Sequence, residues 1–132
     1  MDKPLFSKLV LEAVNALPDE FADRLENVDV IVEDQPDEKQ LKKVPERSLL
    51  LGLYEGIPQT KRGSSYGMVL PDKITIFQKP IEQKCRTDED IVRQVGETVR
   101  HEIAHHFGIS DDQLRLFERE RRNKLAKENS IT

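Results

Sequence analysis

Hydrophobic positions spaced three or four residues apart predict a helix near the start of the chain. The spacing covers residues 4–17 and stops before Pro18, because proline does not continue a helix. The apolar positions are Leu5, Phe6, Leu9, Val10, Ala13, Val14 and Leu17. Asp19 then offers an N-cap for a short second helix that reaches about Leu25. The chain is therefore expected to open with helices.

The middle of the chain changes to patterns that predict strands. The strand candidates are VDVIVE (residues 28–33), LLLGLYEG (residues 49–56) and KITIFQK (residues 73–79). In the third candidate, Ile74 and Ile76 fall on one face, because side chains alternate along a strand. The polar residues 33–43 are expected to form an exposed connection with one helical turn. Residues 57–67, rich in Gly, Ser and Pro, are expected to form the longest loop.

The longest helical pattern begins after Thr87 and continues through His106. Thr87 is a favourable N-cap, and the acidic residues that follow it suit the positive end of the helix dipole. At about 100° per residue, one side of this helix is apolar. That side comprises Ile91, Val92, Val95, Val99 and Ile103. Gly96 destabilises a helix interior by about 1 kcal/mol relative to Ala, which predicts that a neighbouring strand approaches the helix closely there.

A last helix is expected from about Asp111 to Lys127, so the order of elements is helices, strands and helices again. This order predicts an α+β fold. A chain of 132 residues is long enough for one ordinary core, and we expect a single domain over residues 1–132.

Charge and composition narrow the possible functions. With 36% hydrophobic and 35% charged residues, the chain is expected to be soluble. The net charge of −4 gives no support for binding to nucleic acid or to an anionic membrane. Glu12 and Asn15 interrupt the first apolar segment, so no signal peptide is indicated. The lone Cys85 excludes an internal disulfide and a Cys-rich zinc site, and packing is its expected role. We expect a cytoplasmic monomer.

All three histidines lie within six positions, in the stretch VRHEIAHHFGISDD. His101 and His105 are one helical turn apart, so their imidazoles can reach one Zn²⁺ ion at about 2.0–2.1 Å. On the helix both lie at the rim of the apolar side, with Glu102 between them and that side. Glu102, beside the first ligand, is the expected general base for a zinc-activated water. His106 points into the apolar side, where a hydrogen-bonded core histidine is expected.

The third zinc ligand is expected downstream of the helix. Gly108 allows the chain to reverse in a left-handed conformation, after which Asp111 completes the pattern HExxHxxGxxD. Asp112 is the adjacent alternative. Glu118 or Glu120 on the last helix is a more distant alternative. Asp111 fits the spacing best.

The stretch HEIAHHFGISDDQL resembles the signature of the small bacterial zincin-like metallopeptidase family, also called minimal zincins. LYEGIP and LPDKITIFQKPI extend the resemblance from about residue 3 to residue 120. It implies a compact α+β zincin-like fold, with a small mixed sheet packed against a long active-site helix. It also implies a Zn²⁺ site at His101, His105 and Asp111, with Glu102 as catalytic carboxylate. Unlike true metzincins, the chain has no methionine after the motif.

These features favour a zinc-dependent peptidase acting on a peptide or protein, and KITIFQK is the candidate edge strand for holding it. Two alternatives stay open. One is a zinc hydrolase of a non-peptide substrate, although the motif of nucleobase deaminases is absent. The other is a non-catalytic zinc-binding interaction domain, since a small domain offers only a shallow cleft. Tyr66 and Arg62, in the long loop, are possible but less favoured contacts for the substrate.

Overall fold

A computed structural model describes residues 1–17, 28–43, 50–56, 72–109, 112–113, 115–116, 119–120 and 122–124. Its elements are α1 (Lys3–Asn15), β1 (Val28–Glu33), α3 (Glu38–Leu41), β2 (Gly52–Glu55), β3 (Asp72–Phe77), α4 (Gln78–Lys84) and α5 (Asp88–His106). The described residues between 112 and 124 are also helical. The predicted helix at 19–25 and the predicted loop at 57–67 lie outside the described residues. The α+β class is confirmed.

The three strands form a mixed sheet in the order β1-β3-β2. β3 runs parallel to β1 and antiparallel to β2. KITIFQK therefore forms the central strand, and its predicted role as a sheet edge is wrong. The physical reason is that β1 and β2 occupy the two hydrogen-bonding edges of β3, which leaves neither edge open to a peptide. Thr75 is as fully buried as Ile74 and Ile76, which agrees with a central strand. Among the described strands, β1 and β2 are the edges.

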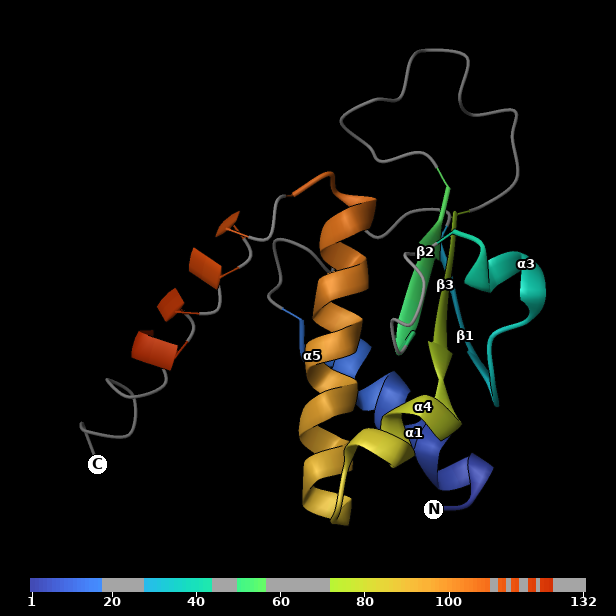
Figure 1. Ribbon diagram of the computed structural model, residues 1–132. Helices are drawn as coiled ribbons and strands as arrows, with labels where there is room; N and C mark the ends of the chain where they lie inside the picture. The colour runs from blue at the N-terminus through green and yellow to red at the C-terminus, as the bar shows by residue number, and fades with distance from the viewer. Residues whose placement is uncertain are drawn as a thin grey trace.

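The main core lies between one face of the sheet and the helices α1 and α5, and α5 contacts α1, β2 and β3 (Figure 1). Ile74 and Ile76 face this core from β3, as predicted. The helices contribute Phe6, Val10, Ile91, Val95, Val99 and Ile103. Two positions assigned to the apolar sides of the helices are wrong, since Leu5 and Val92 are 46% and 51% exposed. None of the described helices is long and apolar enough to cross a membrane.

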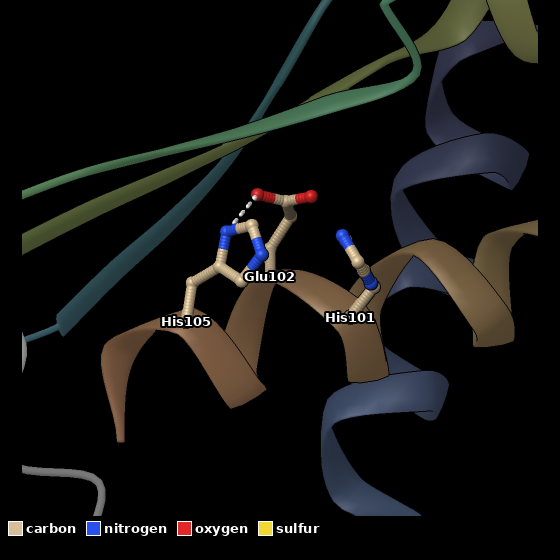
Figure 2. Close-up of side chains that lie close together, drawn as sticks. All are labelled: His101, Glu102 and His105. Atoms are coloured by element: carbon tan, nitrogen blue, oxygen red, sulfur yellow. Dashed lines mark ion pairs between the residues drawn. The ribbon is translucent and has the colours of Figure 1, made fainter. Parts of the chain in front are cut away.

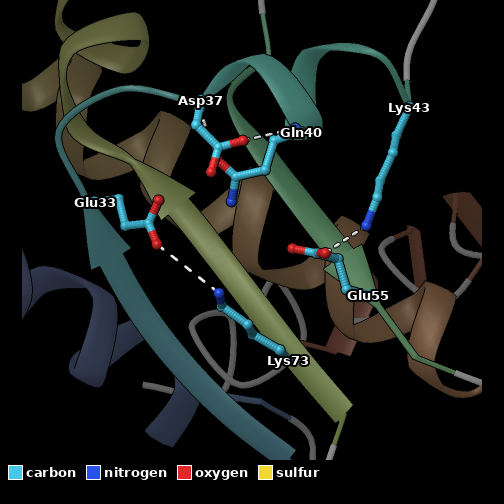
Figure 3. Close-up of polar contacts among 6 residues, drawn as sticks. All are labelled: Glu33, Asp37, Gln40, Lys43, Glu55 and Lys73. Atoms are coloured by element: carbon cyan, nitrogen blue, oxygen red, sulfur yellow. Dashed lines mark hydrogen bonds and ion pairs between the residues drawn. The ribbon is translucent and has the colours of Figure 1, made fainter.

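Polar side chains connect elements on the opposite face of the sheet (Figure 3). Lys73 Nζ of β3 lies 3.9 Å from Glu33 Oε1 of β1. Lys43, just after α3, forms an ion pair with Glu55 of β2. The single predicted turn of helix is α3, which begins at a capping box formed by Asp37 and Gln40. Such half-exposed ion pairs contribute at most about 1 kcal/mol each.

The helix α4 is not predicted from the sequence. It begins directly after β3, where Phe77 is the N-cap residue and makes no side-chain cap hydrogen bond. Pro80 occupies its first turn, a position where the missing N–H of proline is tolerated. Without a capping residue, the segment gives no helix signal, and the strand pattern extends through Lys79.

Candidate metal site

The helix α5 confirms the predicted start and end. The Thr87 hydroxyl accepts a hydrogen bond from the Asp90 N–H at 3.1 Å, and the helix ends at His106. Gly108 has a φ of 69°, the left-handed conformation expected of it. Its N–H donates to the His105 carbonyl at 3.0 Å, and the Ile109 N–H donates to the Ala104 carbonyl at 2.9 Å. This pair of bonds forms a Schellman motif, which turns the chain directly after the two candidate ligands.

His101, Glu102 and His105 lie together near the C-terminal end of α5, with one ligand atom of each within 4.8 Å of the others. Figure 2 shows the Glu102 carboxylate between the two imidazole rings. The ring centroids are 4.5 Å apart, and His105 Nδ1 lies 3.5 Å from Glu102 Oε1. Two imidazoles and a carboxylate form a donor set that suits zinc. The group could therefore hold a metal ion.

The three side chains differ in exposure, as the helical wheel predicts. The His105 side chain is 43% exposed and that of Glu102 is only 8% exposed. His101 is half-buried. The imidazoles are therefore accessible from solvent at the rim of the apolar side, while the carboxylate lies beneath them. A ligand could approach the imidazoles without displacing the core.

The burial of Glu102 depends on Gly52 in β2. A Cβ atom at Gly52 would lie 2.7 Å from Thr98 Cγ2 and 3.1 Å from Glu102 Cγ. Only glycine allows β2 to lie this close to α5. The predicted strand contact at Gly96 is wrong, because among the described residues a Cβ there would meet only the end of the Arg100 side chain. The glycine inside the LLLGLYEG strand pattern is the signal for the true contact.

His106 is a buried, hydrogen-bonded histidine, as predicted. Its side chain is fully buried, and its Nδ1 lies 2.6 Å from Asp72 Oδ2. The Tyr54 hydroxyl donates to the same carboxylate oxygen at 2.8 Å. Asp72 and Tyr54 are not predicted from the sequence, because both residues are far from the motif along the chain.

The third-ligand candidates have different outcomes. Asp111 lies outside the described residues, as do Glu118, Tyr66 and Arg62. Asp112 is exposed, and its Oδ1 lies 3.5 Å from Arg115 Nη1. It is not part of the group formed by His101, Glu102 and His105. Glu120 is also exposed. Asp111 therefore stays a prediction.

Cys85 is a free, half-buried cysteine that packs against the main core. Burial raises the pKa of its thiol above the usual value, and the charge of Asp90 acts in the same direction. Packing, its expected role, agrees with this environment.

Comparison with known proteins agrees with these features. The sequence model of a family described as zincin-like metallopeptidase matches residues 25–121. A conserved hypothetical protein from Thermus thermophilus is similar in structure, with a TM-score of 0.54 and 24% sequence identity. The similarity covers 81% of this chain and 94% of that chain, and at this identity it shows the fold alone. No curated protein matches the chain.

Proposed function

We propose, given that the chain belongs to the zincin-like metallopeptidase family, that it hydrolyses peptide bonds with the help of a zinc ion. The observation that carries the proposal is the cluster of His101, Glu102 and His105 at the end of α5. Two of its members are suited to hold the ion, and the third is suited to move a proton.

His101 and His105 would hold the ion through one ring nitrogen each, and we propose Asp111 as the third ligand. A zinc ion there would supply Lewis acidity, lowering the pKa of a coordinated water and polarising the substrate carbonyl. The Schellman turn at Gly108 favours this ligand set, because it redirects the chain three residues before Asp111.

Glu102 would act as the general base. Its carboxylate lies between the two imidazoles and is held beneath them by the close packing of β2 on α5. A base in this place can take a proton from the attacking water and pass it to the leaving amine. The contact with Gly52 limits the carboxylate's movement, which favours proton transfer at one fixed position.

We further propose that β2 holds the substrate. It is an edge among the described strands, and it packs on α5 beside the candidate ligands. One edge of β2 is paired with the antiparallel strand β3. The main-chain N–H and C=O groups of its other edge can form hydrogen bonds with a peptide, which would add to the sheet as a further strand. A peptide bound there would lie near Glu102.

The variant Glu102→Gln tests this proposal. It keeps the size of the side chain and removes the base, so we expect it to retain zinc and folded structure and to lose peptide hydrolysis by at least about a hundredfold. Glu97→Gln, an exposed position on the same helix, is the matched control and should keep full activity. Turnover over a broad peptide panel and zinc content should be measured together.

Equal activity of Glu102→Gln and wild type would contradict the proposed role. Wild-type protein that binds zinc but cleaves no peptide would contradict the peptidase proposal. That result would favour the non-catalytic zinc-binding alternative.

A further inference from the structure

One buried carboxylate connects three elements around the proposed site. Asp72, at the start of β3, is 1% exposed. Its Oδ2 atom accepts a hydrogen bond from the Tyr54 hydroxyl of β2 at 2.8 Å. The same oxygen lies 2.6 Å from Nδ1 of His106, the last residue of α5. Asp72 therefore joins β3 to both β2 and α5.

The chain leaves space for this carboxylate at Gly56. A Cβ atom at Gly56, the residue after β2, would lie 2.4 Å from Asp72 Oδ1. Gly56 also has a φ of 156°, a value that other residues rarely adopt. A side chain at this position would displace Asp72 from its contacts. Gly56 thus keeps the carboxylate between the Tyr54 hydroxyl and the His106 ring.

Burying the Asp72 carboxylate beside His106 removes both groups from water, which costs free energy that burying apolar side chains would not. Replacing a buried ionic pair by apolar residues of similar size is often neutral or stabilising. An apolar cluster would therefore stabilise the fold as well. It would not supply hydrogen bonds of fixed direction, which is what the Asp72 carboxylate adds to the packing of Tyr54 against the His106 ring.

The fixed direction matters because His106 adjoins the candidate ligand His105. His106 also lies one helical turn after Glu102, on the side of α5 that packs against the sheet. The contacts at Gly52 and at Asp72 thus both attach the last turns of α5 to the sheet. Between them they set how His105 and Glu102 lie relative to β2.

We propose that Asp72 is a positioning residue of the zinc site, acting through His106 on His105 and Glu102. This inference rests on the proposed zinc site but not on peptide hydrolysis. Tyr54 would support the same arrangement from β2. Asp72 itself would contact neither the metal nor the substrate.

The test compares Asp72→Ala and Tyr54→Phe with the control Phe77→Leu, which alters a fully buried side chain in the second hydrophobic cluster. Zinc affinity is measured by competition with a chromophoric chelator, and Co²⁺ is used as a spectroscopic probe of the ligand geometry. We expect Asp72→Ala to weaken zinc binding by at least about tenfold and to change the Co²⁺ absorption spectrum. Tyr54→Phe should produce a smaller change in the same direction, and Phe77→Leu neither.

If Asp72→Ala binds zinc as tightly as Phe77→Leu and gives the wild-type Co²⁺ spectrum, the inference is wrong. Should Asp72→Ala fail to fold, Tyr54→Phe decides, and a wild-type spectrum and affinity for that variant would overturn the inference. Wild-type protein that binds neither metal would overturn the zinc site and this inference together. Metal binding without peptide cleavage would overturn the peptidase proposal alone.

Discussion

His105 and His106 are consecutive residues in opposite environments. The His105 side chain is 43% exposed and lies beside Glu102 at the rim of α5. His106 is fully buried, and its ring contacts Asp72 and lies edge-on to Phe107. One residue of a helix turns the side chain by about 100°, which is enough to move it from solvent to core. The same residue type therefore suits two different purposes here.

The comparison separates what the two sides of α5 require. A metal ligand needs an accessible ring nitrogen, and little of the fold's stability should depend on it. A buried histidine needs a hydrogen-bonded partner, because an unpaired polar group in the core is costly. The exposed side of the helix end should therefore determine metal binding, and the buried side should determine stability and alignment.

The largest expected effect is on the buried side. His106→Ala removes one of the partners of the buried Asp72 carboxylate. Breaking such a buried pair costs about 3–5 kcal/mol of unfolding free energy. His105→Ala should change the unfolding free energy by less than about 0.5 kcal/mol, because its side chain is largely exposed, but it should abolish zinc binding. Urea denaturation of both metal-free variants measures the difference. Similar losses of stability would contradict the division into two sides.

A smaller effect is expected where the sheet meets the buried side. Gly52→Ala places a Cβ atom against Thr98 and Glu102 and should destabilise the protein by about 1–3 kcal/mol through overpacking. Gly96→Ala is the matched control on α5, where the end of the flexible Arg100 side chain is what a Cβ meets within the described part of the chain. It should stabilise the protein by up to about 1 kcal/mol, because alanine favours the helix. Thermal denaturation distinguishes the two, and a stabilising Gly52→Ala would show that β2 is not held against α5 as described.

The sequence predicts those features of the fold that depend on residues close together in the chain. The bounds of α5 follow from Thr87 and Gly108, whose effects on a helix act within a few residues. The central place of β3 could not be predicted, because it depends on pairing with β1 and β2, which are distant in the chain. The close contact between strand and helix was predicted at Gly96 but lies at Gly52 for a similar reason. A glycine in the sequence does not show which element packs on it.

The candidate site divides in the same way. The spacing of His101, Glu102 and His105 on one helix is a local property, so their clustering was predictable. The contact between Asp72 and His106 joins residues 34 positions apart, and nothing in the sequence near either residue identifies the partner. The burial of His106 was predictable from the helical wheel, but its hydrogen-bond partner was not.

X-ray absorption spectroscopy at the zinc edge of the purified protein tests the central claim most directly. The account predicts one zinc per chain, with two imidazole nitrogens and the remaining ligands oxygen, at distances of about 2.0–2.2 Å. His105→Ala should lose this signal, and the exposed control Glu97→Gln should keep it. A protein without zinc, or a zinc ion bound through Cys85 or fewer than two imidazoles, would contradict it.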